Sequence, residues 1–167
     1  MNRNIIQMAE AGSSCQKNIE QRTIEGMPQL IREAGASMGP GANVVVLACH
    51  WRYFAAEDLM GLKKMASNID YRVVRMPCSG QFQEKWITAA LDSGADAVLV
   101  MGGHPATCHY VKYSNEAPQM PTLKNGPPGF DPARLLIDWS EGDRSERFVG
   151  SVDKLVATVE RLREESQ

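Results

Sequence analysis

The chain has 167 residues, a formal net charge of -2 and 43% hydrophobic residues, which suits one domain that buries roughly two thirds of its unfolded surface. A chain with so small a net charge has no strong positive potential to attract the phosphates of a nucleic acid, so we expect no nucleic-acid partner. No segment approaches the roughly 20 apolar residues of a membrane span, and the first residues lack the apolar run of a signal peptide. We therefore expect a cytoplasmic protein, in which the four cysteines stay reduced and serve metal binding, redox chemistry or catalysis before disulfides.

The order of apolar and polar segments predicts the architecture. Residues 1–42 are polar with apolar positions at helical spacing, and they are predicted to form a helical appendage and a linker. From 43 to 167, short apolar runs alternate with amphipathic segments, which is typical of βαβ units. Strands are predicted at residues 43–48, 71–76, 95–101 and 134–139, and helices at residues 24–34, 55–66, 81–93 and 148–162. The predicted fold class is α/β, with a flavodoxin-like open, mostly parallel sheet of about four strands and flanking helices.

The stretch 115–132 interrupts this alternation. It contains five prolines where a crossover helix would connect the last two predicted strands, and proline removes backbone donors and clashes inside a helix. We expect either a long loop that contacts a partner protein or a disordered connector.

Cysteines and histidines follow the ends of three predicted strands. In chain order they are Cys49, His50, Cys78, His104, Cys108 and His109. Because ligands bind at the carboxyl ends of the strands in open α/β sheets, the three thiols are expected to converge on one edge of the sheet. The alternative is that these cysteines only fill the core as small apolar residues.

The spacing of these residues limits their chemistry. Structural zinc normally uses close pairs such as C-x-x-C, and the residue three positions after Cys49 is Arg52. A cysteine nucleophile needs a base within hydrogen-bonding reach, whereas His50 and His109 are sequence neighbours of cysteines and point away from them on an extended chain. An iron–sulfur cluster fits best, since its thiolates come from scattered loops and histidine replaces cysteine in some centres. No GxGxxG or P-loop motif follows a predicted strand and no carboxylate pair stands out, so we expect no catalytic residues.

From about residue 43 onward the chain resembles the delta, or iron–sulfur, subunit of methyl-viologen-reducing hydrogenases, which links hydrogenase to heterodisulfide reductase. The matching stretches are ACHWRYFAAEDLMG, RVVRMPCSGQFQEKWITAALDSGADAVLVMGGHPATCHY and RLLIDWSEGDRSERF. The resemblance implies a non-catalytic electron-transfer subunit with a [2Fe-2S] cluster, for which Cys49, Cys78 and Cys108 are the expected ligands. It also implies two partners, namely a flavin- and iron–sulfur-containing, heterodisulfide reductase A-like protein and a further oxidoreductase subunit.

Two positions depart from that family's pattern. Arg52 stands where the family usually has a second cysteine, and Gly103 stands where it has a cysteine before the histidine of GGHP. The fourth ligand is therefore open between His104, which is nearest to the motif, His50, Cys15, a partner residue and no residue. The alternative for His104 is a histidine that only hydrogen-bonds the backbone of its turn. The alternative to an electron carrier is a cluster-free adaptor, kept only for its docking surface.

Three glycines accompany the expected ligands. Gly80, Gly102 and Gly103 are expected to let backbone N–H groups approach the inorganic sulfides, although they would serve equally as plain loop glycines. Residues 1–40 and the proline-rich stretch are expected to wrap partner subunits. Deletion of residues 1–40 is therefore predicted to leave the α/β core folded.

Overall fold

The computed structural model describes residues 5–6, 16–49, 70–77, 82–102, 131–138 and 144–165. Within these ranges, five strands form one sheet, in which every pair of neighbours is parallel. The strands are β1 (Ile5–Ile6), β2 (Asn43–Cys49), β3 (Asp70–Met76), β4 (Ala97–Met101) and β5 (Leu135–Asp138). The helices are α1 (Gln16–Ala36), α4 (Glu84–Asp92) and α6 (Arg144–Glu165), with a short 3-10 helix η3 (Pro132–Arg134) before β5.

The strand order β1-β3-β2-β4-β5 confirms the predicted fold class. The four predicted strands are present, and their order β3-β2-β4-β5 is the flavodoxin-like arrangement, in which the first strand of the core lies between the second and the third. β1 adds a fifth strand beside β3, and with two residues it is too short to give a periodic signal. The helix predicted at residues 55–66 and the stretch 115–130 lie outside the described residues, whereas the last residues of the proline-rich stretch form the beginning of η3.

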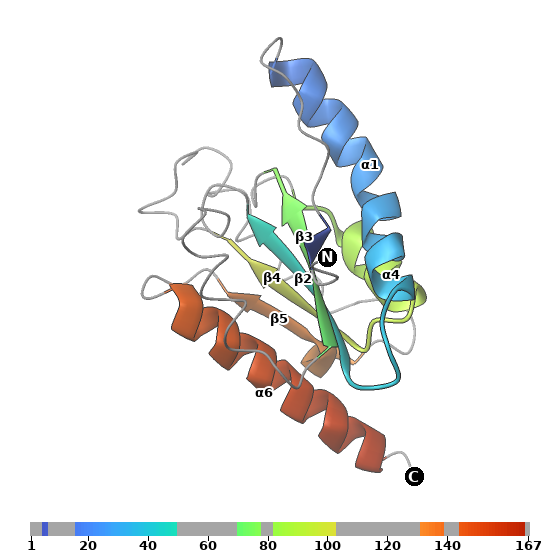
Figure 1. The fold of residues 1–167 in the computed structure, drawn as a ribbon, viewed down its shortest axis with the longest axis vertical. Coiled ribbons are helices and arrows are strands. Elements are labelled where there is room, and N and C mark those ends of the chain that lie inside the picture. Colours follow the sequence, from blue (N-terminus) through green and yellow to red (C-terminus); the bar gives the residue numbers. More distant parts are fainter. Residues whose placement is uncertain are drawn as a thin grey trace.

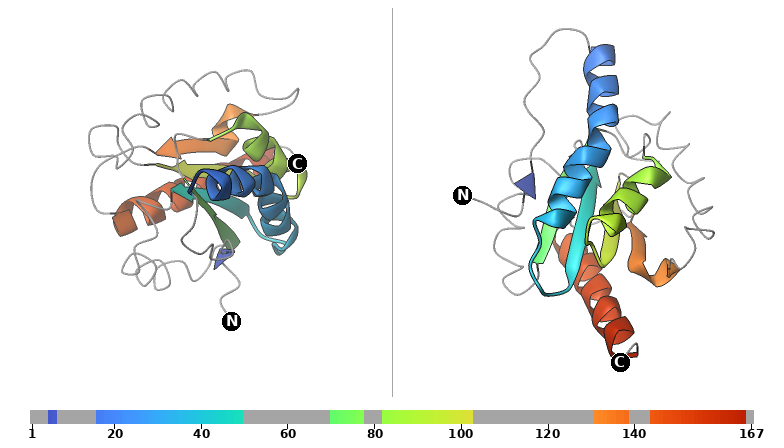
Figure 2. Two further views of the ribbon diagram at one scale, coloured as in Figure 1. Left: turned by 90° about the horizontal axis from the view of Figure 1, so that it is seen from above. Right: turned by 90° about the vertical axis from the view of Figure 1, so that its right-hand side faces the viewer.

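The sheet lies between two helical layers (Figures 1 and 2). Helix α6 covers one face, and α1 and α4 lie side by side on the other. Because side chains alternate along a strand, the core strands contribute to an apolar cluster on each face. The α6 side gathers, among others, Val44, Val46, Leu99, Phe148 and Val152. The α1 and α4 side gathers, among others, Val45, Leu47, Val98, Met27 and Trp86. None of the described helices is both long and apolar enough to cross a membrane.

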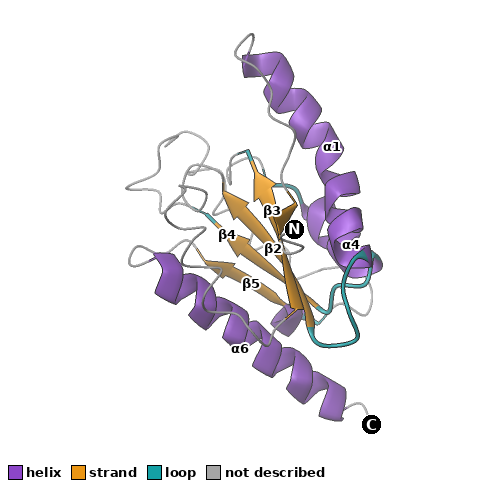
Figure 3. Ribbon diagram, in the orientation of Figure 1, coloured by secondary structure: helices purple, strands orange, loops and turns teal. Residues whose placement is uncertain are grey.

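Helix α1 differs from the predicted appendage. It is longer than the expected helix, and its first turns extend past the sheet (Figure 3). Its second half carries Met27, Ile31 and Ala34, which are 0% exposed and pack against the sheet and α4. This half of α1 therefore belongs to the core, and contact of residues 1–40 with partner subunits stays a prediction. Because deletion would uncover this apolar layer, we now expect it to destabilise the core. The domain boundary at residue 42 stays a prediction.

The end of α1 is tied to β3 by a buried arginine. Arg72 is only 6% exposed. Its Nε donates to Ser37 Oγ at 3.0 Å and its Nη2 donates to the Ser37 carbonyl at 2.7 Å. Burying a guanidinium is costly unless it is hydrogen-bonded, so these bonds fix the position of the turn that follows α1.

Candidate functional site

The carboxyl ends of the core strands meet at one edge of the sheet. The arrows of β2, β3, β4 and β5 point to the same side in Figure 1, as a parallel sheet requires. The strands end on Cys49, Met76, Met101 and Asp138. The register places Cys49 opposite Met76, and Met101 opposite Asp138. The prediction that Cys49 ends the first strand of the core at this edge is confirmed, and its role as a metal ligand stays a prediction.

Cys49 occupies a buried position at the end of β2. It is a free thiol and is 3% exposed. Strand alternation would place it beside Val45 and Leu47 on the α1 and α4 side, but it packs with the cluster on the α6 side, as does the preceding Ala48. Such a shielded thiol suits a cluster ligand, because solvent exposure influences the potential of an iron–sulfur centre. The same burial also suits a cysteine that only fills the core.

Gly102 directly follows β4 and is buried. Its backbone N–H donates to the Asp138 carbonyl at 3.0 Å, which continues the pairing of β4 with β5. This N–H is therefore already engaged, contrary to the expected role of an amide that donates to an inorganic sulfide. A role of Gly102 in close backbone approach stays a prediction.

The other predicted site residues lie outside the described part of the chain. They are Cys78, Gly80, Gly103, His104 and Cys108, together with the further ligand candidates Cys15 and His50. Within the described ranges, no group of three or more His, Cys, Asp or Glu residues could hold a metal. Convergence of the three thiols therefore stays a prediction.

Asp138 is a residue of this edge that the sequence reasoning missed. Its Oδ2 accepts a hydrogen bond from Ser151 Oγ at 3.1 Å, and its Oδ1 lies 3.7 Å from Arg147 Nη1. Its side chain is 12% exposed, against 43% for Arg147. These contacts attach the first turns of α6 to the end of β5. In the sequence, Asp138 is only an aspartate at the end of an apolar run. That pattern does not predict that Arg147 and Ser151 of α6 contact it.

Trp86 carries an unpaired donor in the first turn of α4. α4 follows β3 and begins at Glu84, so Trp86 lies in the first turn of that helix. The residue is 0% exposed, and its indole Nε1 has no hydrogen-bond partner in the described part of the chain. The ring of Phe82 packs edge-to-face on the indole, with 5.7 Å between the centroids.

One of these features fits an iron–sulfur group. Thiolate is the ligand that such clusters use, and the Cys49 thiol lies at the predicted strand end.

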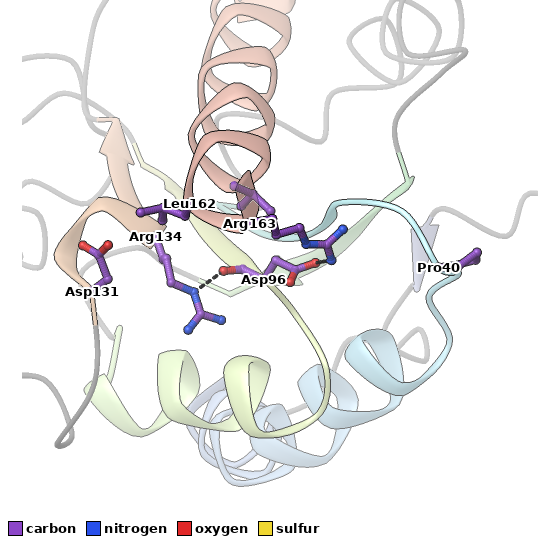
Figure 4. Close-up of a pocket in the computed structure, with 7 residues that line it drawn as sticks. Pro40, Asp96, Asp131, Arg134, Leu162 and Arg163 are labelled. Atoms are coloured by element: carbon purple, nitrogen blue, oxygen red, sulfur yellow. Dashed lines mark hydrogen bonds and ion pairs between the residues drawn. The ribbon is translucent and has the colours of Figure 1, made fainter. Parts of the chain in front are cut away.

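A second site lies at the opposite, amino edge of the sheet (Figure 4). It is a hollow of about 640 Å³ lined by Pro40, Asp96, Asp131, Arg134, Val159, Leu162 and Arg163. Asp96 Oδ2 accepts hydrogen bonds from Arg163 Nη2 at 2.7 Å and from the backbone N–H of Asn43 at 2.9 Å. The Asp96 carbonyl accepts a bond from Arg134 Nε.

These bonds give the hollow a structural role. They join the beginnings of β2, β4 and β5 to the last turn of α6. The Asp96 carboxylate is matched by the Arg163 guanidinium, so the pair needs no external ion. Sequence reasoning missed this arrangement because its two charged partners are 67 residues apart and belong to no motif.

Comparisons with known proteins match the α/β part of the chain. The family model of the methyl-viologen-reducing hydrogenase delta subunit matches residues 44–163, which run from β2 into α6. The iron-sulfur subunit of the F420-non-reducing hydrogenase of Archaeoglobus profundus is 32% identical over 123 residues, which cover 72% of this chain and 90% of that protein. The vhu iron-sulfur subunit of the same kind of hydrogenase in Methanocaldococcus jannaschii is 27% identical, with 71% and 91% covered.

A different kind of relative is much longer than this chain. The A-type subunit of the ferredoxin:CoB-CoM heterodisulfide reductase of Methanosarcina mazei is 32% identical over 149 residues, which cover 86% of this chain but only 19% of that protein. The similar region is thus a small part of that longer polypeptide. With most of its α/β core matched by the family model, the chain belongs to the methyl-viologen-reducing hydrogenase delta subunit family.

Proposed function

We propose that this chain is an electron-transfer subunit of a hydrogenase- or heterodisulfide-reductase-like complex and that it carries a [2Fe-2S] cluster at the carboxyl edge of its sheet. The observation that carries the proposal is the buried Cys49 thiol at the end of the central strand β2. Support comes from relatives that are named iron–sulfur subunits. Cys49, Cys78 and Cys108 would hold the cluster, and His104 is the first candidate for the fourth position. The bound cluster would supply one-electron redox chemistry.

The proposed partners are an A-like heterodisulfide reductase subunit and a further oxidoreductase subunit. In the Methanosarcina relatives, a region similar to this chain belongs to the A-type reductase polypeptide itself. Since one polypeptide carries both units there, we propose that the two units are direct neighbours when they occur on separate chains. A cluster domain accepts and releases electrons but selects no substrate, so its function requires a partner on each side of the electron path.

Iron analysis of protein purified anaerobically together with its partners tests the proposal. We expect about two irons per chain, broad visible absorption and a paramagnetic signal on one-electron reduction. Single replacement of Cys49, Cys78 or Cys108 by serine should remove or destabilise the cluster, because each change deletes a thiolate. Cys15→Ser is the matched control, since this cysteine lies outside the region that matches the family.

The possible results separate the alternatives. A colourless, iron-free wild-type complex would refute the electron carrier and leave a cluster-free adaptor. Full iron retention in all three ligand variants would contradict the proposed ligands. Loss of iron in Cys15→Ser would identify the fourth ligand, and His104→Ala compared with His50→Ala would decide between the two histidines.

A further inference from the structure

Cys49 and Asp138 lie on the same face of the sheet, near its carboxyl edge. Cys49 packs with the cluster on the α6 side, and the Asp138 carboxylate contacts side chains of α6. The strand register places Ala48 opposite Met101 and Met101 opposite Asp138. Because neighbouring strands are about 4.8 Å apart, the ends of β2 and β5 are separated by roughly 10 Å. Helix α6 begins at this edge and contacts β2, β4 and β5, so a single helix packs over all three strands (Figure 1).

Asp138 attaches the first two turns of α6 to this edge. It accepts a hydrogen bond from Ser151 Oγ at 3.1 Å, and its other carboxylate oxygen lies 3.7 Å from Arg147 Nη1. Gly150 lies between these two contact residues in the sequence, is exposed, and would meet nothing within 4 Å if it carried a Cβ. A glycine inside a helix lowers the stability of that helix, and close packing does not explain this one. The Asp138 contacts therefore hold a turn that is intrinsically weak.

We propose that the first two turns of α6, residues 144–151, are a cover segment that shields the Cys49 thiol and opens by local unfolding. Proteins open locally where their elements are least stable, and Gly150 lowers the stability at the start of this helix. The Asp138 contacts keep the cover segment closed, so Asp138 is a positioning residue for Cys49. The importance of this shielding for an iron–sulfur centre rests on the proposed function, because solvent exposure changes the potential of such a centre. The shielding itself requires no metal.

Alkylation of Cys49 by iodoacetamide measures the opening of the cover segment. The full-length, reduced chain is freed of any iron with a chelator, and peptide mass spectrometry follows Cys49 separately from the other cysteines. Asp138→Ala deletes both contacts and should raise the alkylation rate about tenfold, whereas Ser151→Ala deletes one contact and should raise it less. Gly150→Ala stabilises the helix without a new contact and should lower the rate about fivefold. The control Arg163→Ala deletes a contact of α6 at the opposite edge of the sheet and should leave the rate unchanged.

The results separate this inference from the proposed function. Alkylation rates that follow the global stability measured in urea, with the control included, would show that Cys49 is reached by global unfolding and would overturn the inference. Unchanged rates in the three α6-edge variants, or a wild-type rate as fast as in urea, would overturn it as well. An iron-free wild-type complex with the expected alkylation rates would overturn the proposed function alone. If Asp138→Ala fails to fold, Ser151→Ala and Gly150→Ala still decide the question, because they should change the rate in opposite directions.

Discussion

Replacing Gly35 by alanine should weaken the packing of α1 on α4. A Cβ at this position would overlap Ser93 Oγ and lie 3.0 Å from Ser93 Cβ and 3.3 Å from the Ala90 carbonyl oxygen. Overpacking of this kind typically costs about 1–3 kcal/mol, whereas alanine gains up to about 1 kcal/mol over glycine inside a helix. We expect a net loss of about 1–2 kcal/mol in the free energy of unfolding, or a melting temperature lower by about 2–8 °C.

Gly26→Ala provides the matched control within the same helix. Gly26 is exposed and a Cβ there would meet nothing within 4 Å, so this variant should be more stable than wild type by about 0.8–1 kcal/mol. Urea denaturation followed by circular dichroism measures both variants. Adding Ser93→Gly to Gly35→Ala removes the overlapped side chain, and a double-mutant cycle should show a favourable coupling of about 1 kcal/mol. A Gly35→Ala protein that is as stable as Gly26→Ala would refute the close contact between α1 and α4.

Two further predictions test the α6 face and the amino edge. Phe148 is 1% exposed and packs edge-to-face on Tyr71 with 5.5 Å between the ring centroids, so Phe148→Ala should cost about 3–5 kcal/mol in urea denaturation and Phe148→Leu much less. A loss below about 1 kcal/mol for the alanine variant would show that α6 does not pack on the sheet as described. Asp96→Ala removes the carboxylate that accepts from Arg163 and from the first backbone amide of β2, so it should cost about 1–3 kcal/mol. The control Arg161→Ala disrupts only an exposed pair within α6 and should cost at most about 0.5 kcal/mol; equal losses would contradict the joining role of Asp96.

The sequence alone determined the four core strands and their parallel arrangement. The run from Val44 to Cys49 is apolar at every position, and such a run is required where a strand is covered on both faces. The alternation of apolar runs with amphipathic segments determined the α/β class, because helical crossovers connect parallel strands. The place of Cys49 at the carboxyl edge followed directly, since the end of a strand is a local property of the chain.

Only the tertiary structure decided which residues share an environment. It placed Met27 and Ile31 of α1 against the sheet, although the polar composition around them predicted an appendage. It packed Cys49 with the apolar cluster on the α6 side, which strand alternation does not predict, and it left the Trp86 N–H without a described acceptor. It also joined Asp96 to partners from distant segments. The periodicity of a segment predicts which of its faces is apolar. Which other segment packs on that face depends on contacts between residues far apart in the sequence, and no local pattern predicts those contacts.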